Sequence, residues 1–425
     1  MAWRCHTADT SPQVLPHSIP EHRPYFTLHL NRNCQNYSSV FHKPGYRHVL
    51  QDPRCALRSQ DLEHFGRLGP DSLHIFGQNR LDRTTSRTRI ADIALGTLTQ
   101  NIMEFQRCSI NGISYGEGVT EAMRGAALRQ GRSDYLSPQE QDHQLQQMKA
   151  DMIHTLNGAF RNRYLQPGKL TLVSPRLADE IATRTSLQRD HIIDFFRAMA
   201  ICHTVIAEKP DHIERPFDIE YKAESPDEAA LAGAARDVGF PFLARSLSTV
   251  EIEVLGTAER YTPLKVLEFN STRKRMSVIV RTPEGKIVLY CKGADSVIYE
   301  RLAANHDPDI REATSRDLES FANGGLRTLC VARRYLDEQD YLDWSAAYDL
   351  ATAAMQDREE EIEKACNLVE KHLTILGATA LEDKLQEGVP ETIELLHGAG
   401  IKLWVLTGDK IQTAIEIGMA FCAFV

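Results

Sequence analysis

The stretch FNSTRKRMSVIVRTPEGKIVLYCKGAD, residues 269–295, gives the strongest indication of the fold. Its runs at 274–281 and 286–293 are rich in apolar residues and are separated by the sequence Pro-Glu-Gly, a pattern typical of two strands joined by a turn. Two similar runs, at 250–255 and 261–269, come just before it. The sequence therefore predicts at least four consecutive strands in this part of the chain.

Helices are expected before and after these strands. Residues 221–240 carry Ser225 in an N-cap position, Pro226 at the first helical position and acidic residues in the first turn. Gly239 marks the end of this helix. Further helices are predicted over 186–206, over 310–323 and over the charged segment 339–372.

A hairpin is predicted at FQRCSINGISYG, residues 105–116. Asn111-Gly112 lies between apolar residues there, and Asn-Gly is a strong hairpin signal because both residues accept the positive φ that the turn requires. The polar residues that follow, especially 139–152, are expected to form a solvated helix or a flexible insert.

The C-terminal part alternates between the patterns of strands and helices. Strands are predicted at 373–381 and 401–409, and helices at 389–400 and 410–421. Alternation of this kind is typical of the α/β class with a parallel, doubly wound sheet. Only about half of such a sheet is present here.

The composition favours a soluble protein of two or three domains, with 425 residues, 42% of them hydrophobic and 25% charged. No apolar run approaches the roughly 18 residues of a membrane span, and the first residues lack the apolar core of a signal peptide. The nine cysteines include no CxxC pair. We therefore expect reduced thiols in the cytoplasm, and we exclude disulfide-rich and zinc-ribbon proteins.

The balance of charge changes near residue 91. Residues 1–91 contain 12 basic and 7 acidic residues, whereas the rest contains 37 basic and 51 acidic residues. The acidic body argues against a general nucleic-acid binder, whose contact face should be basic. The first segment has no sustained periodicity. We expect a disordered tail or a misassigned reading frame there, with a targeting peptide as the alternative.

A candidate phosphate site lies at Thr407, Gly408 and Asp409, where a predicted strand passes directly into a helix. Glycine permits a sharp turn, and a helix N-terminus presents free N–H groups to an anion. Ligands of open α/β sheets bind at this end of the strands. An ordinary capped turn between strand and helix would also explain the three residues.

Two further candidates lie in the stretch quoted first. Lys292 ends a predicted strand, where it suits a polyphosphate, and Gly293 after it leaves room for a ligand near the backbone. Phe269 enters a turn with the cations Arg273, Lys274 and Arg275, which fits a purine with phosphates nearby. The alternatives are a solvated lysine and a core phenylalanine beside a solvated basic turn.

Six motifs occur in a characteristic order and spacing. They are KAESPDEAAL (222–231), FNSTRKRMS (269–277), KGAD (292–295), GLRTLCVA (325–332), GATALEDKLQEGVPETI (377–393) and GIKLWVLTGDK (400–410). Together they resemble the type-IV P-type ATPases, the phospholipid flippases, over about 330 residues.

The resemblance implies a fold of mixed α/β and α+β character. A nucleotide-binding (N) domain, residues 120–372, would contain an antiparallel sheet with helices. It would be inserted in a haloacid-dehalogenase-like, Rossmann-type phosphorylation (P) domain. Residues 92–119 and 373–425 would be parts of that domain.

The resemblance also implies a role for each matching residue. Phe269 would stack on adenine, and Glu228 and Ser271 would line the base and ribose pocket. Three cations, Lys274, Lys292 and Arg327, would face the polyphosphate. The γ-phosphate would meet Thr407, Gly408 and Asp409.

ATP is the ligand and Mg²⁺ the metal that the resemblance implies, although the family's GDGxND motif for the metal does not occur in the chain. A phospholipid and a membrane would be reached through other segments, and a small β-subunit is an expected partner of the family. The parent protein would lie in the plasma membrane or in Golgi or endosomal membranes, with this portion on the cytosolic side.

The motif that carries the family's nucleophile is incomplete. The family writes DKTGTLT followed by QN. Residues 96–101 match its second part, but Ile93, Ala94 and Leu95 take the places of Asp, Lys and Thr. Asp92 lies one residue too early, and on a strand such a shift turns a side chain to the opposite face. We therefore expect no catalytic residue and no aspartyl-phosphate.

Three functions follow as expectations. The first is the ATP-binding cytosolic portion of a flippase, present as a fragment or as a gene model misassigned before Gly96. The alternative is a catalytically dead nucleotide-binding or regulatory module. A soluble haloacid-dehalogenase-type phosphatase is disfavoured, because its nucleophile is missing as well.

Overall fold

The computed structural model describes residues 99–120, 138–209 and 217–386, the short strands 27–29, 38–40, 72–76 and 402–406, and a few single positions between 123 and 395. The chain divides into two compact units. The larger comprises Met103–Thr120 and Ser133–Glu382, and the other comprises Met1–Ile102, Glu121–Arg132 and Asp383–Val425.

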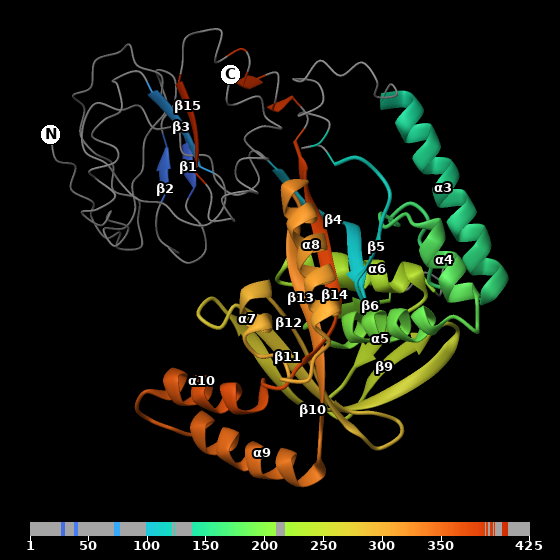
Figure 1. Ribbon diagram of the computed structural model, residues 1–425. Coiled ribbons are helices and arrows are strands. Elements are labelled where there is room, and N and C mark those ends of the chain that lie inside the picture. The colour runs from blue at the N-terminus through green and yellow to red at the C-terminus, as the bar shows by residue number, and fades with distance from the viewer. Residues whose placement is uncertain are drawn as a thin grey trace, which may run out of the picture. The chain divides into compact units, whose positions relative to one another are not determined.

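The larger unit is built on an antiparallel sheet that has nine strands among the described residues (Figure 1). In spatial order they are β5 (Ile113–Tyr115), β4 (Thr99–Ile110), β14 (Thr374–Leu385), β13 (Arg327–Leu336), β12 (Ile287–Gly293), β11 (Arg275–Arg281), β10 (Thr257–Asn270), β9 (Val250–Val254) and β8 (Phe242–Arg245). A separate antiparallel pair is formed by β6 (Ile206–Glu208) and β7 (Glu220–Lys222).

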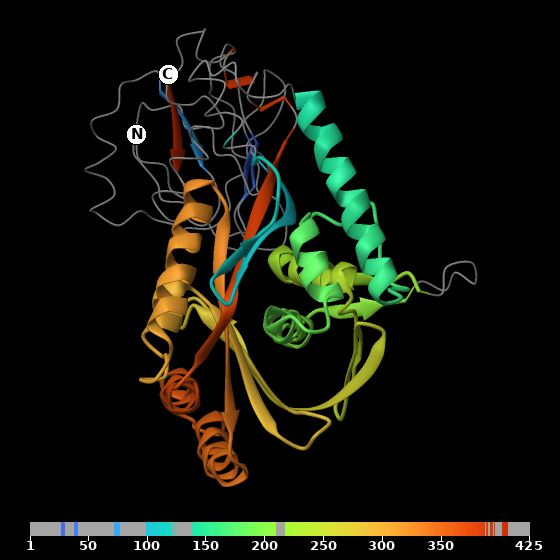
Figure 2. The same cartoon turned by 45° about the vertical axis from the view of Figure 1, so that its right-hand side comes forward.

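Helices cover both faces of this sheet (Figure 2). On one side lie α3 (Pro138–Ala159), α4 (Pro175–Ala182), α5 (Leu187–Ile201) and α6 (Pro226–Val238). The other side carries α7 (Asp295–Tyr299), α8 (Pro308–Asn323), α9 (Glu338–Thr352) and α10 (Arg358–Val369). The sheet is therefore the middle layer of three.

Alternation along the strands builds a separate core on each face. In β12, Val288 and Tyr290 belong to the core under α5 and α6, whereas Leu289 and Cys291 belong to the core under the other helices. This follows because successive side chains of a strand point to opposite faces. Both faces of the strand are buried, which explains its nearly continuous apolar sequence.

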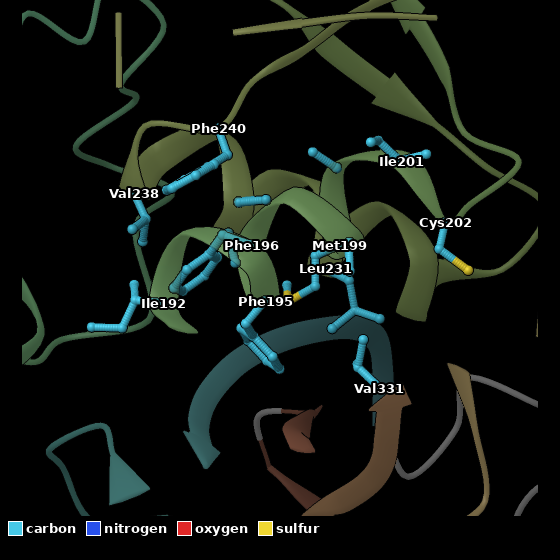
Figure 3. Packing of buried hydrophobic residues seen from close by; sticks show 14 of the residues in the cluster. Ile192, Phe195, Phe196, Met199, Ile201, Cys202, Leu231, Val238, Phe240 and Val331 are labelled. Carbon is cyan, nitrogen blue, oxygen red and sulfur yellow. The ribbon is translucent and has the colours of Figure 1, made fainter. Parts of the chain in front are cut away.

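The core under α5 and α6 is packed around aromatic rings (Figure 3). Phe195 and Phe196 of α5 are fully buried, and the Phe196 ring stacks on Phe240 with centroids 5.5 Å apart. Val331 of β13 approaches this cluster from the sheet. Burial of one such side chain contributes about 1.5–3 kcal/mol, so these contacts hold α5 firmly on the sheet.

The predictions that depend on local sequence are confirmed. The 105–116 hairpin is β4 and β5, with Asn111 and Gly112 at φ values of 51° and 73°. The helix predicted after Ser225 is α6, which ends before Gly239 at a φ of 115°. Ser225 occupies the N-cap position without a capping bond from its side chain.

The polar segment expected to be a solvated helix or flexible insert is the helix α3. It is not solvated all round, because Met152 and Leu156 are buried in the core under α5 and α6.

Two predictions about elements were wrong. The segment 339–372 is not one helix but two, α9 and α10, with Asp357 at a φ of 50° between them. The break allows α10 to fold back on α9, where Trp344 Nε1 donates to the carbonyl of Ala365 at 2.8 Å. The strand predicted at 373–381 is β14, but it joins β13 antiparallel rather than a parallel sheet.

The smaller unit is described only through short strands. β3 (Ser72–Phe76) pairs parallel with β15 (Lys402–Leu406), and β1 (Thr27–His29) pairs antiparallel with β2 (Ser38–Val40). β15 lies inside the strand predicted at 401–409. The helix predicted at 410–421 lies outside the described residues. Of the helix predicted at 389–400, only positions 389, 392, 393 and 395 are described, and these are helical.

Within the described part of the chain, every helix is too short or too polar to cross a membrane.

Candidate functional site

A buried ion pair joins two of the predicted site residues. Lys292, near the end of β12, places its Nζ 2.7 Å from Oε1 of Glu228 in the first turn of α6. The two side chains are only 10% and 12% exposed. Burial favours a raised pKa for Glu228, but the Lys292 charge and hydrogen bonds from Lys292 and Thr204 bring that pKa below its usual value. Glu228 therefore stays ionised at neutral pH.

Thr204 completes the environment of this carboxylate. Its backbone N–H and its Oγ1 donate to Oε2 of Glu228 at 3.0 and 2.7 Å. The turn that carries Thr204 is fixed by Arg245, whose guanidinium donates to the carbonyls of Ile201 and His203. One carboxylate oxygen therefore serves Lys292 and the other serves Thr204. Thr204 could not be recognised as a site residue from the sequence, because its partner is 24 residues away.

His203, next to Thr204, is buried and neutral. The N–H of Val205 donates to its Nδ1 at 3.2 Å, so the ring hydrogen lies on Nε2, which is 2.9 Å from the carbonyl of Ala200. Burial lowers the pKa of His203 to about 3, and the charges of Arg245 and Lys292 act in the same direction. A neutral ring is the form that both hydrogen bonds require.

Lys292 is one of the residues that line a small cavity. The residues around it are mainly apolar and come from α5, α6 and the sheet: Ala198, Met199, Cys202, Leu231, Leu329, Val331 and Thr379. Burial raises the pKa of the Cys202 thiol to about 11, so this cysteine is a neutral wall residue at physiological pH.

The turn between β10 and β11 carries the second group of predicted residues. Phe269 is 61% exposed, so the alternative of a core phenylalanine was wrong. The turn is closed by Asn270, whose Oδ1 accepts from the N–H groups of Thr272 and Arg273 at 2.7 and 2.9 Å. Ser271 and Lys274 are exposed, and Lys274 has a φ of 51°.

The prediction that Arg273 and Arg275 stand as cations beside phosphates was wrong. Their side chains are 4% and 2% exposed, and both bind the fully buried carboxylate of Glu370. The exposed cation of this turn is Lys274. The physical reason is a partner distant in sequence, since a buried guanidinium requires an opposite charge and acceptors.

The expectation of free space at Gly293 is also corrected. A Cβ there would lie 2.5 Å from the Cβ of Arg275 and 2.7 Å from the carbonyl oxygen of Lys274. The chain's own turn therefore fills the space that a ligand was expected to use. The N–H of Ala294 donates to the carbonyl of Lys274 at 3.0 Å, which fastens the Phe269 turn to the strand of Lys292.

Arg327, at the start of β13, is also held by α6. Its Nη1 lies 3.2 Å from Oδ1 of Asp227, the residue before Glu228. The first turn of α6 thus binds Arg327 through one carboxylate and Lys292 through the next. The structure places Phe269, Lys274 and Lys292 on or between the adjacent strands β10, β11 and β12, and Glu228 meets Lys292 from helix α6.

The remaining predicted positions are not described. Thr407, Gly408 and Asp409 lie outside the described residues, and so do Asp92 and the nucleophile positions Ile93, Ala94 and Leu95.

Mg²⁺ does not fit the acidic residues at this site. Among the residues described here, no group of three or more His, Cys, Asp or Glu could hold a metal ion. Asp227 and Glu228 are committed to Arg327 and Lys292.

The family model for the cytoplasmic domain N of P-type ATPases matches residues 191–388. This range contains the ion pair, the Phe269 turn and Arg327. The chain contains a P-type ATPase N domain. The resemblance inferred from the six motifs is therefore confirmed, and the nine-stranded sheet is the sheet of the N domain together with β4 and β5.

The relatives of this N domain are phospholipid-transporting ATPases. Phospholipid-transporting ATPase dnf2 of Schizosaccharomyces pombe is 48% identical over 327 residues, which cover 76% of this chain and 23% of that protein. Phospholipid-transporting ATPase IC of Homo sapiens is 43% identical over 325 residues, 76% of this chain and 23% of that protein. Phospholipid-transporting ATPase C4F10.16c of S. pombe is 39% identical over 397 residues, which cover 93% of this chain and 27% of that protein. The chain spans about a quarter of the length of these relatives.

Proposed function

We propose that this N domain binds ATP on the cytosolic side of a phospholipid-translocating P-type ATPase. The observation that carries the proposal is the first turn of α6, which holds Lys292 and Arg327 through adjacent carboxylates. The exposed ring of Phe269 lies on a turn bonded to the strand of Lys292. An exposed aromatic ring with cations nearby is an arrangement suited to a nucleotide.

We assign each residue the role that the family resemblance implies. Phe269 stacks on adenine, while Ser271 and Glu228 line the base and ribose. Lys274 is the exposed cation of the turn and reaches the phosphates directly. Lys292 and Arg327 act on the phosphates from within their ion pairs, so their contribution is smaller than that of a free charge.

The rest of the proposal concerns the domain assignment of the chain and the activity of its parent protein. We assign residues 120–372 to the N domain, whose sheet is extended by β4, β5 and β14, and the rest of 92–119 and 373–425 to a haloacid-dehalogenase-like P domain in which Thr407, Gly408 and Asp409 meet the γ-phosphate. The parent requires Mg²⁺, acts on a phospholipid in a plasma, Golgi or endosomal membrane, and pairs with a small β-subunit. The names of the relatives support the lipid.

A second candidate is favoured by Ile93 in the position of the nucleophile. An isoleucine has no lone pair with which to attack a phosphate, so the chain as written would bind ATP without transferring its phosphoryl group. It would then act as a nucleotide-binding regulatory module.

Amide hydrogen exchange with and without ATP tests the binding site. We expect ATP to slow exchange in the segments 269–277 and 292–295 of the full chain, while β8 and β9 stay unchanged. Exchange rates that are the same with and without saturating ATP in every segment would contradict the proposed site.

A further inference from the structure

Glu370 accepts three side-chain hydrogen bonds, all of them from the β10–β11 hairpin. It follows α10 directly and is fully buried. One oxygen accepts from Arg273 Nη2 and from Ser277 Oγ, and the other accepts from Arg275 Nε at 2.7 Å. Three residues of the β10–β11 hairpin therefore converge on one side chain.

The same two arginines hold the backbone of the turn. Arg273 Nη1 donates to the carbonyl of Glu268 at 2.9 Å, and Arg275 Nη1 donates to the carbonyl of Arg273 at 3.1 Å. Glu268 precedes Phe269, so the backbone is fixed directly before the exposed ring. Asn367 of α10 adds a further anchor, since its Oδ1 accepts from Arg275 Nη2 at 2.7 Å.

These bonds lie on the opposite face of the sheet from Lys292. Ser277 is flanked in β11 by Met276 and Val278, which belong to the core under α5 and α6, whereas Ile279, two residues on, belongs to the core under α8–α10. Since side chains alternate, Ser277 shares the face of Ile279. Glu370 is fully buried, so it cannot itself touch a nucleotide in solution.

We propose that Glu370 is a positioning residue for the nucleotide site, which fixes the turn 270–275 through Arg273 and Arg275 and so holds Phe269 in place for stacking. This inference rests on the proposed binding of ATP. Loss of the carboxylate leaves two buried guanidinium groups without an opposite charge, and the turn is the part of the structure that can move to hydrate them.

The test uses the full chain with Glu370→Gln, and Glu359→Gln as the control. Glu359 is an exposed carboxylate in the first turn of α10, the helix that Glu370 follows. We expect Glu370→Gln to speed amide exchange at Thr272 and Arg273 and to weaken ATP binding about fivefold or more, because stacking is disturbed. The control should change neither quantity.

A double-mutant cycle separates positioning from a general loss of structure. In the background of Phe269→Ala, adding Glu370→Gln should weaken ATP binding by less than about twofold, because the ring to be positioned is gone. If Glu370→Gln does not fold, Ser277→Ala replaces it. That variant removes one donor to the carboxylate, and we expect smaller changes of the same sign.

The outcomes distinguish this inference from the proposed function. If the wild-type chain binds no ATP, the proposed function is wrong. If the wild type binds ATP and Glu370→Gln binds it with the same affinity although its turn is loosened, the positioning role alone is wrong. Equal losses in the presence and absence of the Phe269 ring would also overturn it.

Discussion

Lys292 Nζ lies 2.7 Å from Oε1 of Glu228, so the lysine that sequence assigns to phosphate is already paired with a carboxylate of α6. The pair has little exposure, and Thr204 satisfies the second oxygen. Lys292 is therefore a structural link between β12 and α6 as well as a candidate ligand for phosphate.

Breaking this pair should cost stability as well as affinity. We expect Glu228→Ala to lower the free energy of unfolding by roughly 3–5 kcal/mol, because Lys292 is left as a buried charge without its partner. The double variant with Lys292→Met should recover part of that loss. Urea unfolding measures the free energy of unfolding of each variant. The pairing would be contradicted if the double variant lost at least as much free energy as the two single variants together.

Lys292→Ala should weaken the binding of ATP more than the binding of adenosine. The reason is that its charge acts on phosphates rather than on the base. Competition with a fluorescent nucleotide measures both ligands on one protein. Equal losses for ATP and adenosine would mean that the lysine acts only through its contact with α6.

The stability of the larger unit should fall as the pH falls from about 6.5 toward 3. The ring of His203 has a pKa of about 3 in the folded chain and 6.5 when unperturbed, so the unfolded state binds the extra proton throughout that window. The slope is up to about 1.4 kcal/mol per pH unit.

The control for this prediction is His203→Gln, which cannot titrate. We expect the difference in the free energy of unfolding between wild type and variant to shrink as the pH falls below 6.5. Glu228, with its lowered pKa, adds a loss of stability below its usual 4.5 in both proteins and cancels in the comparison. A difference that does not vary between pH 7 and pH 5 would contradict the prediction.

Gly293→Ala should destabilise the chain by about 1–3 kcal/mol, because its Cβ would overlap the Cβ of Arg275. A matched control is Gly233→Ala in α6, where an added Cβ meets nothing within 4 Å. That variant should be more stable by about 1 kcal/mol, since alanine favours a helix over glycine. Thermal unfolding of the two variants decides the prediction, and a Gly293→Ala as stable as wild type would refute the close approach.

The chain as written should form no acid-stable phosphoenzyme with γ-labelled ATP and Mg²⁺. Ile93 offers no nucleophile, and Ala94 and Leu95 offer neither cation nor hydroxyl. An acid gel detects the label. A hydroxylamine-sensitive label that Asp92→Asn abolishes would show that Asp92 serves as the nucleophile.

Features encoded in a few adjacent residues could be predicted from the sequence. The Asn111-Gly112 hairpin and the ends of α6 at Pro226 and Gly239 depend on local backbone preferences, and the structure has them where the residues indicate. The family could also be recognised, because its motifs are short and contiguous.

Features that depend on distant partners could not be predicted. Arg273 and Arg275 look like solvated cations until Glu370 is placed beside them, 97 and 95 residues further along the chain. The break between α9 and α10 has the same origin, because the contact of Trp344 with α10 stabilises the arrangement in which α10 folds back on α9. The pattern of charge alone favours one long helix there.

Calorimetric titration of ATP into the full chain and into Phe269→Ala tests the proposed function most directly. We expect the wild type to bind with a dissociation constant of roughly 0.1–1 mM, a free energy of about −4 to −5.5 kcal/mol. Loss of the ring should remove about 1–3 kcal/mol, the contribution of a base–aromatic stack. A wild-type chain that gives no heat of binding, or a Phe269→Ala variant with the affinity of the wild type, would contradict the nucleotide site described above.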